Sequence, residues 1–201
     1  VGVYEQLARK YATNGWIKRI GRGAYARTGD QVDWIGGICA LQKQLGLPIH
    51  VGGKTALELR GVGHFVPARE GAYLYIFGVP FYRLPTWFIG YKWGRRITYK
   101  MPRLFGSGPP LGLTGHRSGN LEIQISAPER AIMEVMHLVP AEQSISEARL
   151  LMEGLGNLRP KLVQELLEHC HSIKVKRLFL CLADQCGHPW LKKLNISRVD
   201  L

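Results

Sequence analysis

Cysteine is scarce in this sequence, and long hydrophobic runs are absent from it. The 201 residues include four cysteines, which are Cys39, Cys170, Cys181 and Cys186. A disulfide framework is not expected with so few cysteines in a chain of this size, so we expect free thiols and a cytoplasmic protein. No apolar run approaches the roughly 18 residues that a membrane-spanning helix needs, so we expect no membrane partner.

The sequence also lacks a recognisable metal-binding motif. His171 and His188 lie near the last three cysteines, but no C-x-x-C pair occurs and the spacings match no common zinc site. Thiols without such spacing are more often buried or idle. We therefore expect no metal and no other cofactor.

Catalytic motifs are missing as well. The sequence contains no G-x-S-x-G and no H-E-x-x-H. His50, His64 and His116 fall in expected loops, where a lone histidine is more often structural or exposed than catalytic. We expect a protein without catalytic residues that is not an enzyme. An enzyme that acts on nucleic acid or nucleotides is the least favoured alternative.

The stretch Gly52-Gly53-Lys54-Thr55 is similar to the end of a phosphate-binding loop. The full pattern requires a glycine five positions before Gly53, where this sequence has Pro48. Proline has no N–H to offer a phosphate, so we expect a tight turn into a helix instead. Three capping boxes of the S/T-x-x-E type predict helix starts at Thr55–Glu58, Ser126–Glu129 and Ser144–Glu147.

Positive charge is abundant. Lys and Arg number 27 against 15 Asp and Glu, which gives a net charge of +12. This excess favours an anionic partner, most often nucleic acid and sometimes an anionic membrane.

Acidic residues are absent between Gly71 and Leu121, where basic and aromatic residues alternate. The basic residues that we assign to a candidate second basic surface are Arg83, Lys92, Arg95, Arg96, Lys100 and Arg103. Such a segment can bind single-stranded nucleic acid, or it can form a half-buried sheet with one basic face. We favour the sheet for the aromatics. An RNA-binding module that uses residues 82–103 remains the main alternative function.

Residues 1–29 have a different pattern. Residues 3–14 predict an amphipathic helix that ends at Asn14-Gly15. Residues 16–27 predict two short strands around a glycine-rich tip. A helix followed by a basic hairpin is typical of the second half of a winged helix-turn-helix, although an amphipathic helix and hairpin with a solvated basic side would have the same pattern.

We expect this unit to bind double-stranded DNA. The polar stripe of the helix, predicted to face the major groove, is Gln6, Arg9, Lys10 and Thr13. The wing residues, predicted to contact phosphates or the minor groove, are Lys18, Arg19, Arg22 and Arg27. Because only Val1-Gly2 precede the helix, the supporting helix of the motif has no counterpart here, and we expect a truncated unit.

Residues 30–201 predict a second domain with a mixed α/β part and a helical end. The predicted strands are Ala72–Val79, Trp87–Trp93, Ile97–Tyr99 and Leu121–Ile125. The predicted helices are Val32–Leu45, Thr55–Arg60, 127–138, 144–154, 160–171 and 173–186. The expected fold class is therefore α+β, with an N-terminal winged helix-turn-helix and a C-terminal domain that ends in a helical bundle.

Several blocks in register over nearly the whole chain resemble one family. They include LARKYATNGWIKRIGRGAYARTGD, ALQKQLGLPIHVGGKTALELRG, LPTWF and SAPERAIMEVM, and the end of the chain from LMEGL to GHPWLKKL continues the likeness. Together they resemble the AbiEi antitoxins of type IV (AbiE) abortive-infection toxin–antitoxin systems.

The resemblance implies a transcriptional autorepressor that binds inverted repeats in its own promoter. It also implies a functional partner, a nucleotidyltransferase-like toxin that the antitoxin counters without forming a stable complex. Tyr4–Tyr11 corresponds to the recognition helix of the family and Trp16–Arg27 to its wing.

Overall fold

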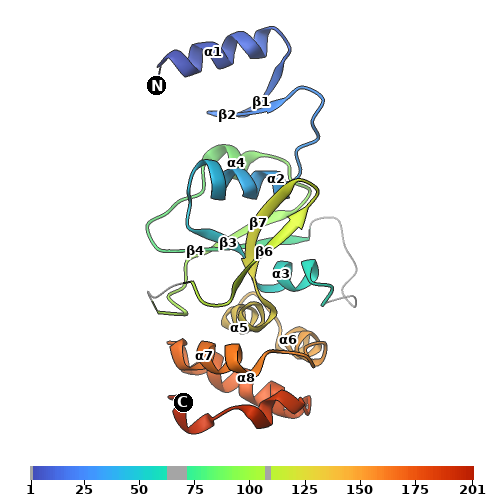
Figure 1. Ribbon diagram of the computed structural model, residues 1–201, viewed down its shortest axis with the longest axis vertical. Coiled ribbons are helices and arrows are strands. Elements are labelled where there is room, and N and C mark those ends of the chain that lie inside the picture. The colour runs from blue at the N-terminus through green and yellow to red at the C-terminus, as the bar shows by residue number, and fades with distance from the viewer. Residues whose placement is uncertain (1, 63–71, 107–109) are drawn as a thin grey trace.

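The computed structural model describes residues 2–62, 72–106 and 110–201, and it describes side chains from residue 6 onward. The molecule is elongated, and its parts follow one another along the long axis in chain order (Figure 1). A helix and a hairpin occupy the N-terminal end, a five-stranded sheet lies in the middle, and helices form the C-terminal end. This arrangement confirms the α+β class with a helical end.

The N-terminal end consists of α1 (Gly2–Thr13), β1 (Ile17–Gly21) and β2 (Ala24–Arg27). The two strands pair antiparallel, with Ile17 opposite Arg27 and Lys18 opposite Ala26. The helix and both strands lie within two residues of their predicted positions. Local signals were sufficient here because the helix ends at Asn14-Gly15 and the hairpin turns at Arg22-Gly23.

The central sheet has the strand order β5-β4-β3-β7-β6. Its strands are β3 (Ile49–Val51), β4 (Tyr73–Gly78), β5 (Arg96–Lys100), β6 (Leu113–Ser118) and β7 (Leu121–Ser126). The pairs β3–β4 and β6–β7 are antiparallel, whereas β3–β7 and β4–β5 are parallel. The sequence did not predict β3, which has three residues, or β6.

Helices cover the sheet on both sides (Figure 1). Toward the hairpin lie α2 (Trp34–Cys39), its π-helical continuation η1 (Ala40–Gln44) and α4 (Thr86–Gly90). Toward the C-terminus lie α3 (Gly53–Leu59) and α5 (Pro128–Leu138). The single helix predicted over Val32–Leu45 is thus a short α-helix followed by a π-helical turn.

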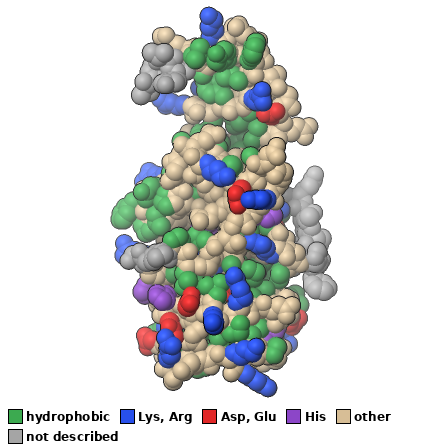
Figure 2. Space-filling model, in the orientation of Figure 1, with side chains coloured by type: hydrophobic (Ala, Val, Ile, Leu, Met, Phe, Trp, Pro, Cys, Tyr) green, Lys and Arg blue, Asp and Glu red, His purple; other side chains and the backbone are tan. Residues whose placement is uncertain are grey.

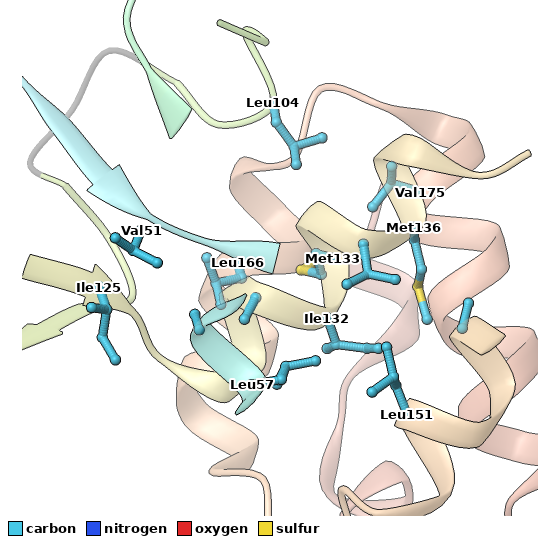
Figure 3. Packing of buried hydrophobic residues seen from close by; sticks show 14 of the residues in the cluster. Val51, Leu57, Leu104, Ile125, Ile132, Met133, Met136, Leu151, Leu166 and Val175 are labelled. Atoms are coloured by element: carbon cyan, nitrogen blue, oxygen red, sulfur yellow. The ribbon is translucent and has the colours of Figure 1, made fainter. Parts of the chain in front are cut away.

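The hydrophobic core is centred on α5, which is buried on nearly all sides. Ile132, Met133 and Met136 of this helix are surrounded by side chains from the sheet, from α3 and from the C-terminal helices (Figure 3). Those helices are α6 (Ile145–Glu153), α7 (Pro160–His169) and α8 (Ile173–Gln185), followed by the 3₁₀ turns η2 (Pro189–Lys193) and η3 (Ile196–Arg198). The four predicted C-terminal helices are confirmed.

The strand predicted over Trp87–Trp93 is wrong, because this segment begins with α4. Phe88 and Trp93 are buried, with ring centroids 5.0 Å apart, and the Trp93 indole donates a hydrogen bond to the Phe88 carbonyl. The intrinsic strand preference of aromatic residues is weak and yields to packing of this kind.

Two of the three predicted capping boxes are also wrong. The helix α3 begins at Gly53, and the Thr55 hydroxyl donates to the Tyr73 carbonyl and accepts from the Tyr75 N–H of β4. The Ser126 hydroxyl donates to Glu134 instead of capping α5. At α6 the Ser144 hydroxyl does accept from the Glu147 N–H, at 3.1 Å, so this capping box is confirmed.

Among the described residues, no helix is long and apolar enough to cross a membrane.

Candidate nucleic-acid interface

The polar stripe of α1 lies on the surface. Gln6, Arg9, Lys10 and Thr13 are all exposed. The Thr13 hydroxyl donates to the Arg9 carbonyl one turn earlier, at 3.0 Å, so the helix itself already holds this hydroxyl. Residues spaced by three and four positions share one helix face, so the stripe presents long polar side chains side by side.

The apolar stripe on the opposite side of α1 is more exposed than the apolar face of an amphipathic helix that packs against a domain core. Leu7 and Tyr11 are each more than two-fifths exposed, and Trp16, which lies 6.5 Å from the Tyr11 ring, is largely exposed. Hydrophobic and basic side chains therefore share this end of the molecule (Figure 2).

The wing residues Lys18, Arg19, Arg22 and Arg27 are exposed on the hairpin. Successive residues of a strand point to opposite faces, so Lys18 and Arg19 do not face the same side. The Arg19 side chain also donates to the Gly21 carbonyl, at 3.3 Å. Because Ile17 lies opposite Arg27, the register puts Arg19 and Arg27 on one face of the hairpin and Lys18 on the other. The structure thus separates the four predicted wing residues, with Arg22 at the tip.

The hairpin rests on α4 through a very close backbone approach. A Cβ atom on Gly21 would lie 2.6 Å from the Trp87 Cβ atom, so only glycine fits here without displacing the hairpin. Beside this contact, a cavity of about 840 Å³ opens between the hairpin and α2, lined by residues such as Tyr25, Gly37 and Trp93. A single contact at Gly21 therefore contributes strongly to the position of the wing.

The candidate second basic surface is divided in the structure. Lys92, Arg95 and Arg96 lie before and at the start of β5, and Arg103 follows its end. Arg95 pairs with Glu58 at 3.0 Å and stacks on Trp34, and Lys100 pairs with Glu142. Arg83, Lys92, Arg96 and Arg103 are exposed, and within the described part of the chain no ion pair engages them. A single basic face over 82–103 does not form.

The segment that is similar to a phosphate-binding loop is occupied by a carboxylate of the chain itself. The Gly53 N–H, at the start of α3, donates to Glu134 Oε2 at 2.9 Å. A Cβ atom on Gly52 would collide with this carboxylate, which explains the glycine. The Lys54 ammonium pairs with Glu147 of α6. Carboxylates of the chain itself therefore occupy the position in this loop that an anionic ligand would take.

Glu134 is the centre of a buried polar network. Its carboxylate accepts hydrogen bonds from His50 Nε2 and Arg130 Nε at 2.8 Å, and from the Ser126 hydroxyl at 2.8 Å. Burial by itself raises the pKa of this carboxyl, but the charges and hydrogen bonds of His50 and Arg130 outweigh it and hold the pKa at about 2.

The structure places two of the three histidines considered for catalysis in strands, where loops were expected. His50 lies in β3, buried against Glu134, and His116 lies in β6, so the prediction that they occupy loops is wrong. His64 lies outside the described residues. Burial lowers the pKa of His116, and the nearby Arg60 charge lowers it further.

In the regions that the structure describes, no group of three or more His, Cys, Asp or Glu side chains is placed to hold a metal ion.

Comparison with known proteins gives two family matches and likenesses to solved structures. Residues 1–68 match the family described as "Transcriptional regulator, AbiEi antitoxin N-terminal domain", and residues 72–201 match "Transcriptional regulator, AbiEi antitoxin, Type IV TA system". The fold is similar to the crystal structure of the RV2827C protein from Mycobacterium tuberculosis, with a TM-score of 0.60 and 14% identity over 95% of this chain and 70% of that one. At this identity the likeness supports the fold alone. No curated protein matches the chain in sequence.

Proposed function

This chain belongs to the AbiEi family, the antitoxins and transcriptional regulators of type IV toxin–antitoxin systems, and we propose that it represses its own promoter by binding inverted repeats in double-stranded DNA. The observation that carries the proposal is the pairing of an exposed polar helix stripe with an exposed basic hairpin in one N-terminal unit. Helix followed by wing is the order of DNA-contacting parts in a winged helix-turn-helix.

We assign DNA binding to residues 1–29 and antitoxin activity to residues 30–201. The division is supported by the sheet, in which β3 lies between β4 and β7 and therefore makes residues 49–51 part of the larger body. In this proposal Gln6, Arg9 and Lys10 read the major groove, because Arg and Gln side chains suit guanine and adenine edges.

The larger domain counters a nucleotidyltransferase-like toxin, which acts as a functional partner without a stable complex. We propose no catalytic step and no cofactor for this domain, and we place the protein in the cytoplasm. Support comes from the family assignment and from two internal contacts of the loop, because Lys54 is paired with Glu147 and the Gly53 N–H donates to Glu134. Both groups that a nucleotide phosphate would need are therefore already engaged.

The assignment can be tested by the salt dependence of binding to a promoter duplex. Removing one phosphate-binding side chain should lower the slope of log K against log salt by about 0.9. Lys18→Ala and Arg22→Ala should each show this decrease together with weaker binding. Lys161→Ala, an exposed residue of α7, is the matched control and should bind like the wild type. Unchanged binding and slope in both wing variants would refute the wing assignment.

A further inference from the structure

The turn after β4 carries an aromatic side chain that is almost fully exposed to solvent. Phe81 is 94% exposed, and its neighbours Val79 and Tyr82, together with Met101 beyond the end of β5, are exposed as well. In Figure 2 hydrophobic side chains project from the left edge of the molecule, near the height of β4 in Figure 1. An isolated exposed apolar residue needs no explanation, but a group of them on one edge does.

The backbone of this turn is strained. Phe81 has a φ of +74°, and it is the one non-glycine residue with a positive φ in the described chain. Pro80 before it and the positive φ fit a type II turn, in which glycine usually occupies the position of Phe81. A bulky side chain in this region costs free energy, and residues with such strain are found most often at functional sites, including ligand-binding sites.

A hydrogen bond from the neighbouring strand fixes the turn. The Tyr99 hydroxyl of β5 donates to the Tyr82 carbonyl at 3.0 Å. Because β4 and β5 run parallel, with Phe77 opposite Lys100, both strands end at the same edge. The chain segments that follow them, 79–83 and 101–103, therefore emerge together, and each carries one exposed arginine, Arg83 and Arg103.

The charge of this edge is positive. The sequence has no Asp or Glu from Gly71 to Leu121, and Glu142, which lies beside the end of β5, is paired with Lys100. Within the described residues neither Arg83 nor Arg103 takes part in an ion pair. Proteins hold unpaired nucleotides with exposed aromatic rings and arginine side chains, and both kinds of side chain occur on these two chain segments.

We propose that this edge patch, defined as Val79, Phe81, Tyr82, Arg83, Met101 and Arg103, binds single-stranded nucleic acid. A base stacks on the Phe81 ring, and Arg83 and Arg103 contact the flanking phosphates. The two exposed arginines and the lack of acidic residues in this segment favour a polyanion over a protein partner. The site is separate from the N-terminal unit that we assign to duplex DNA.

The test is fluorescence anisotropy with labelled oligouridylate and oligothymidylate of about 12 nucleotides, within the usual range of single-strand sites. Phe81→Ala should weaken binding by about 5- to 150-fold, the range for removing the stacking of one base. Phe81→Trp should retain binding, whereas Phe81→Leu should lose it although it remains apolar. Arg83→Ala and Arg103→Ala should each lower the salt slope by about 0.7. The two oligonucleotides distinguish RNA from single-stranded DNA as the preferred ligand.

Two controls separate this proposal from duplex binding and from misfolding. Leu150→Ala removes an exposed apolar side chain from α6 and should leave single-strand binding unchanged. Lys18→Ala should weaken binding to the promoter duplex only, and Phe81→Ala should weaken binding to the single strand only. If wild-type protein fails to bind either oligonucleotide, or if Phe81→Leu binds as tightly as wild type, the proposal is overturned. The second result would indicate a hydrophobic docking surface for a protein.

Discussion

Replacing Glu134 by alanine should reduce the free energy of unfolding by about 3–5 kcal/mol, the range found when one partner of a buried ion pair is removed. The carboxylate is 1% exposed and accepts from four donors, which belong to β3, to the start of α3, to β7 and to α5 itself. Without it, three buried donors on His50, Gly53 and Ser126 have no acceptor. Each unsatisfied buried group costs about 1–3 kcal/mol before water enters the space, so the two estimates overlap.

The pKa of Glu134 gives an independent estimate of similar size. The value is lowered from 4.5 to about 2, and each pKa unit corresponds to about 1.4 kcal/mol, so the ionised carboxyl stabilises the folded state by about 3 kcal/mol. A carboxyl with a lower pKa in the folded state contributes fully above the unfolded pKa. Its contribution is therefore present above pH 4.5 and is lost as the pH falls toward 2.

The assay is urea unfolding followed by tryptophan fluorescence, which the five tryptophans make sensitive. Glu134→Gln keeps the side-chain volume and removes the charge. Its loss of unfolding free energy relative to wild type therefore measures how much the ionised carboxyl stabilises the folded state. That deficit should be about 2 kcal/mol smaller near pH 3 than near pH 7. Glu153→Ala, which removes an exposed carboxylate paired with Arg149, should change stability by no more than about 1 kcal/mol.

A deficit of Glu134→Gln that is the same near pH 3 and near pH 7 would refute the argument. It would mean that the carboxyl is not preferentially ionised in the folded protein. A Glu134→Ala variant as stable as Glu153→Ala would contradict the network itself, because three buried donors would then have found other partners at no cost.

Three further variants or treatments test other parts of the structure. Leu57→Ala, in the fully buried core, should cost about 2–5 kcal/mol in urea unfolding, whereas the exposed Leu150→Ala should cost less than about 0.5; equal costs would contradict the placement of the core. Gly21→Val should push the hairpin away from Trp87 and weaken promoter binding while the unfolding midpoint of the larger body changes little. Burial raises the pKa of Cys170, so this thiol should react with a thiol reagent only after unfolding, and rapid labelling of the native protein would disprove its burial.

The sequence predicted best those elements whose signals are local. The helices α5 to α8 have regular apolar spacing, and the N-terminal hairpin has its turn residues in place, so their bounds were close. The strand β3 has three residues and no alternation long enough to detect. For α4 the deciding factor is the packing of Phe88 against Trp93 and the rest of the core, which no local pattern reveals.

The polar contacts of the molecule were least predictable because their partners are distant in sequence. Thr55 and Ser126 each stand at a correct capping spacing, yet their hydroxyl groups bond to β4 and to Glu134. From composition the 82–103 segment was a candidate second basic surface, with a half-buried sheet as the favoured structure for its aromatics. The structure divides it, because Arg96 stands at the start of β5 and Arg103 beyond its end, and because Glu58 and Glu142 from other elements neutralise Arg95 and Lys100.

The same internal pairing explains where the positive charge of the protein remains available. Acidic side chains are few, and in the larger body several of them are paired with nearby cations, as in Lys54–Glu147, Arg130–Glu134 and Arg159–Glu129. Each such pair removes both charges from the field that an approaching polyanion experiences. The net charge of +12 is therefore spread over several surfaces, which are the hairpin, the β4–β5 edge and the C-terminal end, where Lys161, Arg177 and Lys192 are exposed. The glycine-rich loop at Lys54 has the sequence most like an anion site, but Glu147 and Glu134 already occupy its ammonium and its Gly53 N–H, so neither is available to an external anion.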